Sequence, residues 1–299
     1  MKIVIAGGSG FVGTPLVQRR IAHGDEVSVL TRDAASVTAG NPLVWDGRTQ
    51  GAWSAVVADA DAIINLAGEN IGAGRWTDAR KRRLVDSRVN ATRALVEAIR
   101  SRPEGPRVFL SASAVGYYGL RGDEELDESA PRGMGFLADL AARWEAEARA
   151  ADHLARLVVL RFGVILSSSG GALPRMALPF RFGAGGRVGS GRQWMAWVAL
   201  EDALRAIEWS LDTDTVRGTL NITAPEPVRN ADFAKALGRA LRRPSVMPAP
   251  AFALRLLLGD MAEEALLGGQ RVLPRRTMAE GFRFQYPEIA ATLTNQFRH

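Results

Sequence analysis

Apolar residues in this chain occur in short runs that alternate with amphipathic stretches, and this pattern predicts alternating strands and helices. Lys2 to Ala6 is a β-branched run, typical of a strand buried on both faces of a parallel sheet. We expect further strands over the following segments: Glu26 to Thr31, Leu43 to Trp45, Asp61 to Gly68, Arg107 to Ser113, Arg156 to Phe162 and Gly218 to Ile222. Strands that alternate with helices indicate an α/β fold with a parallel sheet.

The stretches between these runs carry apolar residues at helical spacing. The longest predicts a helix from Thr77 to Arg100, with Thr77 as its cap and Pro103 just beyond its end. Shorter helices are expected over the following segments: Phe136 to Ala151, Asp202 to Leu211, and a helix that Asn230 caps and Pro244 ends. The glycine-rich stretch 167–191 holds enough apolar residues to form an ordered lobe, and the last part of the chain is predicted to be helical and then loop-like.

Three glycines follow the first predicted strand at the spacing G-x-x-G-x-x-G. Gly7 is placed to make the tight turn, Gly10 to admit a pyrophosphate close to the backbone, and Gly13 to let the next helix lie against the strand. The N–H groups at the start of that helix would face the phosphates. The alternative is that the glycines merely form a flexible turn. Their position between a buried strand and a helix favours a dinucleotide-binding fingerprint.

The end of the second predicted strand bears on which dinucleotide is bound. Sites that prefer NAD place an acid there to hold the ribose 2′-OH, but here Thr31 occupies the position and Arg32 follows. Arg32 can make a charge-assisted contact with a 2′-phosphate, which favours NADP(H) as the cofactor. Asp33 is the alternative acid, although it falls beyond the strand end. Arg32 would then be an ordinary exposed loop arginine.

Two later strands end in residues suited to a ligand crevice, because open α/β sheets bind ligands at the carboxyl ends of their strands. One ends in small residues up to Gly68, and Glu69 and Asn70 follow as candidates for substrate binding, unless they only form a polar turn. The central strand that ends near Ser113 brings hydroxyl groups to the same edge. Candidates for acid/base chemistry there are Ser111, Ser113, Tyr117 and Tyr118. Their alternative role is hydrogen bonding at the strand end with two loop aromatics.

Composition limits the classes of protein that fit. The chain has 299 residues, of which 47% are apolar, enough for a Rossmann domain with a smaller lobe. We expect residues 1–165 to form an NADP-binding Rossmann domain to which 199–225 return. The remaining segments, 166–198 and 226–299, are expected to form a smaller C-terminal substrate lobe.

Several classes are disfavoured by what the sequence lacks. No run of about twenty apolar residues occurs, so no membrane span is expected. The amino terminus enters a strand without a signal peptide, which favours a cytoplasmic protein. No cysteine is present, which excludes disulfides and thiolate zinc sites, and His23, His153 and His299 lie far apart, so no metal site is expected.

The formal net charge of +6 raises the question of nucleic-acid binding. The arginines are mostly dispersed on predicted helices, and the densest run, from Arg80 to Arg83, is more typical of a solvated helix face. Attraction of anionic phosphorylated ligands is an equally good use of this charge. We therefore expect a small-molecule substrate and no nucleic acid, and leave open the pairing of two copies into a homodimer.

These motifs resemble those of the extended and atypical short-chain dehydrogenases/reductases of the NAD-dependent epimerase/dehydratase type. The matching segments are 7–13, 65–68, 90–92, 111–113, 197–202 and 220–222. A subgroup called epimerase family protein, or predicted nucleoside-diphosphate-sugar epimerase, is similar also over 65–71, 113–119 and 189–193. That subgroup carries a short carboxy-terminal domain that ends near 281–287, so the resemblance covers essentially the whole chain.

The resemblance implies roles for individual residues. The pyrophosphate would be held by Gly7, Gly10, Phe11, Val12 and Gly13, and the adenosine ribose phosphate by Thr31 and Arg32. The cofactor would be lined by Leu66, Ala67 and Gly68, with Ser111 nearby and with Arg88 where relatives often have a cofactor-contacting asparagine. Ser113 occupies the position of the family's catalytic serine or threonine.

One departure from the family is informative. Active relatives carry Tyr-x-x-x-Lys on the helix after the serine strand, where the tyrosine supplies a proton, but here that helix has Phe136 and Leu140. A phenyl ring cannot act as a general acid. Two hypotheses follow. Either Tyr117, Tyr118 or Glu69 transfers the proton in an NADP(H)-dependent oxidoreductase or epimerase that acts on a small polar, free or nucleotide-linked substrate, or the protein is a non-enzymatic NADP(H) sensor or scaffold.

Overall fold

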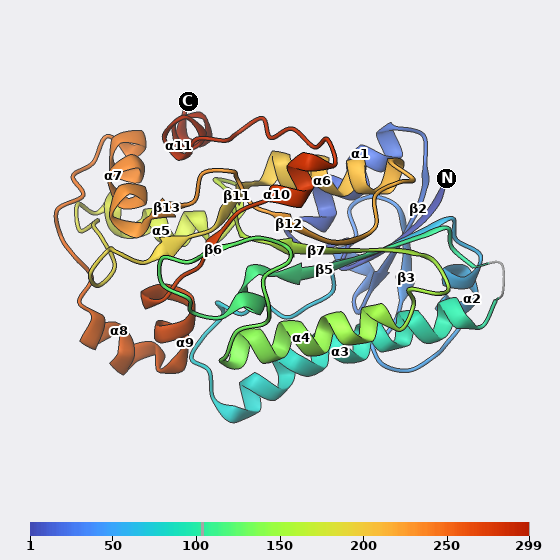
Figure 1. The fold of residues 1–299 in the computed structure, drawn as a ribbon. Coiled ribbons are helices and arrows are strands. Elements are labelled where there is room, and N and C mark those ends of the chain that lie inside the picture. The colour runs from blue at the N-terminus through green and yellow to red at the C-terminus, as the bar shows by residue number, and fades with distance from the viewer. Residues whose placement is uncertain (103–104, 299) are drawn as a thin grey trace.

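A parallel sheet runs through the middle of the molecule (Figure 1). In the computed structural model, which describes residues 1–102 and 105–298, seven strands form it in the order β12-β7-β5-β4-β1-β2-β3, and every neighbouring pair is parallel. The strands are β1 (Lys2–Ala6), β2 (Glu26–Thr31), β3 (Asn41–Val44), β4 (Ala62–Asn65), β5 (Val108–Ala114), β7 (Arg156–Phe162) and β12 (Gly218–Ile222). The predicted Rossmann-type doubly wound sheet is confirmed, while Pro103 and His299 lie outside the described residues.

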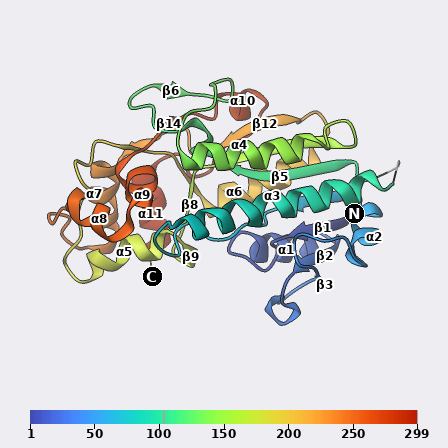
Figure 2. The same ribbon diagram turned by 90° about the horizontal axis from the view of Figure 1, so that it is seen from below.

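Helices cover both faces of this sheet. Helices α1 (Gly13–Ala22) and α6 (Leu200–Asp212) lie on one face, above the sheet in Figure 1. Helices α2 (Trp53–Ala58), α3 (Asp78–Arg100) and α4 (Phe136–Arg149) lie on the other, and Figure 2 shows α3 and α4 running side by side. The hydroxyl of Thr77 accepts a hydrogen bond from the Arg80 N–H, so the predicted cap of α3 is confirmed.

The strands form because their apolar side chains are buried on both faces. Ile5 and Leu110 belong to the core that includes α1 and α6, whereas Val4 and Phe109 belong to the core beneath α2 and α3. All four side chains are at most 1% exposed, and burying each contributes about 1.5–3 kcal/mol. Continuous β-branched runs such as Lys2–Ala6 are therefore what this double-sided burial selects.

A second lobe lies beside the carboxyl edge of the sheet (Figure 1). The elements other than the central sheet and its covering helices are β6 (Glu125–Leu126), β8 (Val164–Ser167), β9 (Gly170–Gly171), α5 (Leu173–Arg181), β10 (Trp194–Met195), β11 (Trp197–Ala199), β13 (Val228–Arg229), α7 (Asn230–Leu241), α8 (Ala251–Leu258), α9 (Asp260–Ala262), β14 (Arg271–Val272), α10 (Arg275–Ala279) and α11 (Ile289–Phe297). Of these, α10 packs against β12 of the sheet. Short 3-10 helices occur at Ala34–Ser36 and Val115–Tyr118, and a π-helix at Glu263–Leu267. Trp197, Phe233 and Leu293 share the core of this lobe.

Two expectations about this lobe are wrong. Asn230 is the first residue of α7 and does not cap it, because its amide oxygen accepts the Val188 N–H at 2.7 Å instead. The end of the chain is not loop-like, since α11 packs against α7. No helix within the described residues is long and apolar enough to cross a membrane.

The final segment of the chain is tied to the rest of the fold by two carboxylates, one of them buried and the other half-buried. Asp202 on α6 is fully buried and accepts hydrogen bonds from the N–H groups of Gln285 and Tyr286, both at 2.8 Å. Glu128 accepts the N–H groups of Asn221 in β12 and of Arg276 and Thr277 in α10. The strand pair β6–β14 adds backbone hydrogen bonds beside Glu128. The C-terminal segment is therefore an integral part of the fold.

We predict that Asp202→Ala loosens the C-terminal segment. Removing the buried carboxylate leaves two partly buried N–H groups without an acceptor, so the free energy of unfolding should fall by about 2–4 kcal/mol. Urea unfolding followed by tryptophan fluorescence measures the loss. The neighbouring Glu201→Gln, which breaks a partly exposed ion pair with Arg19, should change it by less than about 1 kcal/mol. Equal losses in the two variants would contradict this account.

Candidate active site

The glycine turn after β1 lies at the carboxyl edge of the sheet, and several of its backbone N–H groups have no acceptor among the described residues. Gly7 has a φ of +78°, and a Cβ on it would lie 2.8 Å from the Leu66 carbonyl oxygen. A Cβ on Gly13 would lie 2.2 Å from the Gly7 carbonyl oxygen, so only glycine allows α1 to start this close to β1. The N–H groups of Phe11, Val12 and Gly13 find no acceptor among the described residues. They form a cradle for an anion.

The loop after β4 lies against this cradle and is clamped from α3. Ser87 accepts the Glu69 N–H at 3.0 Å, and the Arg88 guanidinium donates to the Glu69 carbonyl oxygen at 2.9 Å. Arg88 is so close to Gly68 that a Cβ there would lie 2.9 Å from its Cζ. Burial lowers the pKa of Arg88 to about 10. The predicted group Leu66, Ala67, Gly68 and Arg88 is thus brought together beside the glycine turn.

The two candidate substrate residues of this loop are engaged locally. The Glu69 carboxylate pairs with Arg80 at 3.0 Å and with Arg83 at 3.7 Å. The Asn70 amide oxygen accepts the Gly72 N–H at 2.8 Å, which makes a turn. Part of the basic run 80–83 therefore neutralises an acid of the protein itself. A substrate at Glu69 would have to compete with two arginines.

The end of β2 is arranged around Asp33. Its carboxylate accepts the Ala35 N–H at 3.0 Å and so caps the 3-10 turn that follows. Thr31 is buried, and its hydroxyl bonds to the Asp33 backbone. Arg32 is exposed, and its side chain has no hydrogen-bond partner among the described residues. The acid is thus turned towards its own backbone while the arginine is free.

A row of polar residues crosses the sheet at the carboxyl ends of β5, β7 and β12. Ser113, Arg161 and Asn221 are register partners on these three adjacent strands, and all are at most 3% exposed. Ser113 donates to the Glu145 carboxylate of α4 at 2.7 Å. Ser111 lies two residues earlier, is 1% exposed, and makes only a 3.5 Å contact with the Ala112 carbonyl oxygen. Of the two serines, Ser113 is the one placed in a polar network.

Glu145 and Arg161 form the buried ion pair of this network. The Glu145 carboxylate accepts from the Arg161 Nε at 2.7 Å and Nη2 at 2.8 Å, and from Arg149 at 2.8 Å. With the Ser113 hydroxyl it thus receives four hydrogen bonds, as many as a carboxylate readily accepts. Burial opposes the charge of Arg161, but the ion pair with Glu145 outweighs it and raises the pKa of Arg161.

The two adjacent tyrosines differ in what their hydroxyls do. Tyr118 is fully buried, accepts from the Arg161 Nη1 at 2.9 Å and donates to the Asn221 amide oxygen at 2.7 Å. Burial raises the pKa of Tyr118 to about 12, although Arg161 and Asn221 favour the phenolate. Tyr117 is half-buried, and its ring lies 3.5 Å from the Arg161 Cζ, but its hydroxyl has no partner among the described residues. Only the Tyr117 hydroxyl is available to a ligand.

The places of the family's tyrosine and lysine are filled by apolar packing. The Phe136 ring meets Trp76 edge-on at 5.1 Å, and the Lys81 ammonium lies 5.5 Å from the ring centroid. Leu140 is 4% exposed. No side chain at these two positions can exchange a proton, as the sequence predicts.

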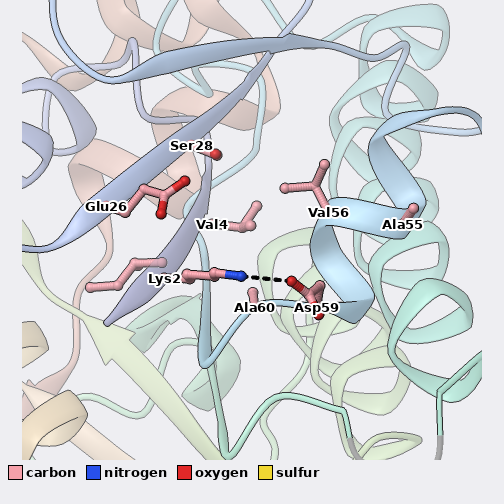
Figure 3. Close-up of a pocket in the computed structure, with 9 residues that line it drawn as sticks. Lys2, Val4, Glu26, Ser28, Ala55, Val56, Asp59 and Ala60 are labelled. Atoms are coloured by element: carbon pink, nitrogen blue, oxygen red, sulfur yellow. Dashed lines mark hydrogen bonds and ion pairs between the residues drawn. The ribbon is translucent and has the colours of Figure 1, made fainter.

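Two hollows on the described surface lie at the amino edge of the sheet, opposite this site. Figure 3 shows the smaller, of about 270 Å³, with the ion pair between Lys2 and Asp59 at 2.8 Å across its rim. The larger, of about 750 Å³, has mixed charges that include Asp61 and Arg107. Because open α/β sheets bind ligands at the carboxyl edge, we place the candidate site there and not in these hollows.

Comparison with known proteins assigns the chain to a family. A model described as the NAD dependent epimerase/dehydratase family matches residues 3–223. The chain belongs to this family. A second model, a domain of unknown function named DUF1731, matches residues 249–296.

Relatives of this family member match it over nearly its whole length. It is 38% identical to the epimerase family protein SDR39U1 of Bos taurus over 98% of each chain, and 37% identical to the epimerase family protein YfhF of Bacillus subtilis over 98% of this chain and 97% of that one. A crystal structure of human SDR39U1 (isoform 2) with NADPH superposes with a TM-score of 0.88 at 35% identity, covering 99% of this chain and 98% of that one. The predicted resemblance to the epimerase family subgroup is confirmed.

More distant structures show the fold alone. A UDP-glucuronic acid 4-epimerase from Bacillus cereus, in complex with UDP-glucuronic acid and NAD, superposes with a TM-score of 0.79 at 16% identity over 99% of this chain and 98% of that one. At this identity the likeness carries no information about the substrate of the present family member.

Sequence reasoning missed several residues of this site. Glu145 lies on the apolar face of its helix, with Ala141 and Ala148 one turn away on either side, and Arg161 ends an otherwise apolar strand core. A charge at such a position indicates a buried partner and could have been noticed. Ser87 gives no comparable signal, because a serine on a long helix has many uses.

We predict a pH-dependent stability that Tyr118 controls. Its folded-state pKa of about 12 lies above the value of about 10 expected in the unfolded chain, so the folded state holds this proton more tightly. The resulting stabilisation is complete below about pH 10 and is lost as the pH rises through about 12. Tyr118→Phe should remove this loss and lower the free energy of unfolding at neutral pH by about 1–3 kcal/mol, because Asn221 and Arg161 each lose a partner.

Urea midpoints of the wild type and the variant, compared at rising pH, test this. Tyr117→Phe is the matched control, since its hydroxyl has no partner among the described residues, and should change the midpoint little at neutral pH. A wild type and a Tyr118→Phe variant that lose stability in parallel above pH 10 would refute the assignment.

Proposed function

We propose that this protein binds NADP(H) and acts as an oxidoreductase or epimerase on a small polar substrate, free or nucleotide-linked. The observation that carries the proposal is the meeting of two features at one edge of the sheet. The open glycine cradle follows β1, while Ser113 lies near the end of β5 and Tyr117 lies just beyond it. A dinucleotide and a reacting oxygen would be held along the same edge.

The residues of the cradle fit a pyrophosphate. Three N–H groups without an internal acceptor lie at the start of α1, where the helix dipole favours negative charge. The only close neighbour of a Cβ on Gly10 would be the Gly7 carbonyl oxygen at 3.1 Å, so the glycine keeps the outer side of the turn free for a ligand. The NADPH in the human relative's crystal structure supports the same cofactor here.

The end of β2 supports NADP(H) over NAD(H). The Asp33 carboxylate caps the 3-10 turn beyond the end of β2, so it does not stand at the strand-end position from which an acid holds a ribose hydroxyl. The exposed Arg32 has a guanidinium free to pair with a 2′-phosphate. Thr31, whose hydroxyl is fixed by the Asp33 backbone, would keep the turn in place.

We expect Arg32→Ala to lose the preference for NADPH. A charge-assisted contact to phosphate contributes about 1.5–3 kcal/mol, so the affinity for NADPH should fall by a factor of about 10 to 100 while that for NADH stays constant. Quenching of tryptophan fluorescence on titration measures both affinities. Arg239→Ala on α7 removes an exposed arginine elsewhere and serves as the control. Equal affinity of the wild type for the two cofactors would remove the basis for NADP(H).

A bound nicotinamide supplies hydride transfer to or from a substrate carbon. The residues of the chain would then manage the oxygen on that carbon. The Ser113 proton is donated to Glu145, so in this arrangement Ser113 can accept a hydrogen bond from a substrate hydroxyl. Tyr117 is the proton-exchanging group that we favour, since the Tyr118 hydroxyl is saturated by Arg161 and Asn221.

We expect Ser113→Ala and Tyr117→Phe each to lower the rate of NADPH oxidation with a carbonyl substrate by a factor of about 100 or more. Neither change removes a cradle group, so the affinity for NADPH should stay within about twofold. A stopped-flow screen of carbonyl compounds at saturating NADPH gives the rates. Tyr286→Phe, which alters the remaining tyrosine, is the control and should retain the wild-type rate. Turnover that survives both substitutions would refute the catalytic assignment.

The alternative is a non-enzymatic NADP(H) sensor, and one contact favours it. Phe11 of the cradle packs against β9, where a Cβ on Gly170 or Gly171 would lie 2.8 or 2.7 Å from its ring. A cofactor bound at the cradle would therefore influence the conformation of the segment 167–191 through Phe11. Protection of that segment from hydrogen exchange by NADPH, in a protein that oxidises no carbonyl compound, would favour the sensor. Oxidation that depends on Tyr117 would favour the enzyme.

A further inference from the structure

The helix that carries the family's proton-transfer position lacks a capping residue of its own. Gly135 stands at the N-cap of α4 and provides no side chain to accept the first N–H groups. These groups are satisfied from a segment more than a hundred residues later. The Glu264 carboxylate accepts the Phe136 N–H at 2.9 Å and the Leu137 N–H at 2.8 Å. The C-terminal domain of unknown function thus supplies the cap of α4.

The glycine is what admits this carboxylate. Gly135 has a φ of +108°, and a Cβ on it would lie 3.0 Å from a Glu264 carboxylate oxygen. Any side chain at residue 135 would therefore displace Glu264 as well as strain the backbone. Gly135 and Glu264 lie in two distant segments of the chain and act together, because the glycine makes room for the carboxylate that caps α4.

The first turn of α4 in turn holds the turn that carries Tyr117. A Cβ on Gly116 would lie 3.0 Å from the Leu137 Cβ, so the two backbones are in close contact. The Tyr117 carbonyl oxygen accepts the Gly133 N–H at 3.0 Å, just before α4 begins. Displacement of the first turn of α4 would therefore move the turn from which the Tyr117 side chain projects.

A second acid of the C-terminal domain reaches α3. Asp260, one helical turn before Glu264, pairs with Lys81 at 2.5 Å. The Asp260 side chain is 64% exposed, and ion pairs of that kind contribute little. Glu264, with two charge-assisted hydrogen bonds to backbone N–H groups, is the stronger of the two ties.

We propose that Glu264 is a positioning residue of the active site, through which the C-terminal domain fixes the first turn of α4 and, with it, Tyr117. The part of this inference that concerns catalysis rests on the proposed function. The part that concerns position does not. The C-terminal domain is, on this account, a component of the active site.

Hydrogen exchange on the full chain tests the positioning. Glu264→Ala should speed exchange at the N–H groups of Phe136, Leu137 and Gly133 by about tenfold, the loss expected from a removed helix cap. In Glu264→Gln the amide oxygen can still accept one N–H, so the exchange rates should lie between those of the wild type and those of Glu264→Ala. Glu263→Ala is the matched control, because Glu263 precedes Glu264 and pairs with Arg255 at the surface.

Kinetics provide the readout that a merely structural role would not give. Glu264→Ala should lower kcat for NADPH oxidation by about tenfold, keep NADPH affinity within about twofold, and be partly rescued in Glu264→Gln. Unchanged exchange at the three N–H groups would overturn the proposal. So would faster exchange spread over the whole sheet with a fall in Tm, because Glu264 would then stabilise the protein generally. If the wild type itself oxidises no substrate, the proposed function fails while exchange still decides the positioning.

Discussion

The buried ion pair between Glu145 and Arg161 is the constraint on which the carboxyl edge of this sheet depends. Breaking such a pair by removing one partner typically costs about 3–5 kcal/mol, because a charge is left unpaired in a dry interior. Here both partners are at most 2% exposed. The pair sets the distance of α4 from β7, and through its hydrogen bonds it orients Ser113 on β5 and Tyr118 after it. Of the two residues that we propose for chemistry, Ser113 is hydrogen-bonded to this pair and the Tyr117 ring lies against its guanidinium.

The same network explains why the C-terminal segment cannot be treated as an appendage. Tyr118 bonds to Asn221, and the Asn221 side-chain amide donates to the Leu273 carbonyl oxygen at 3.1 Å. The chain of contacts from Ser113 thus ends in the domain of unknown function. With Asp202 and Glu128 holding the backbone on either side, this segment is coupled to the sheet by charge-assisted hydrogen bonds as well as by apolar packing.

The sequence predicts the sheet well, because local patterns determine it. The strands Lys2–Ala6, Arg156–Phe162 and Gly218–Ile222 lie where the apolar runs place them. A continuous apolar run of this length fits few structures other than a strand that is buried on both faces. The lobe is harder to predict, since its strands are two to four residues long and are stabilised by distant partners. Asn230 illustrates this, because its side chain has a good local use as a cap, but a nonlocal N–H, that of Val188, takes the amide oxygen instead.

The same distinction between local patterns and distant partners determines which residues of the site can be predicted from the sequence. The glycine turn and the hydroxyls around the end of β5 are visible in the sequence because each is a contiguous motif. The partners Glu145, Arg161 and Glu264 are single residues far apart in the chain, and only the fold brings them to Ser113 and α4.

The loss of the family's tyrosine and lysine is consistent with this arrangement. In active relatives the helix carries the proton-transfer pair, whereas here the corresponding positions, Phe136 and Leu140, pack apolar side chains. Polar groups instead follow the ends of β5, β7 and β12, where Ser113, Arg161 and Asn221 stand in register. A phenol beside a guanidinium is still present, since the Tyr117 ring lies against Arg161, which occupies a strand where relatives use a helical lysine. The guanidinium of Arg161, buried on its strand, requires a fixed counter-ion, and Glu145 is that counter-ion.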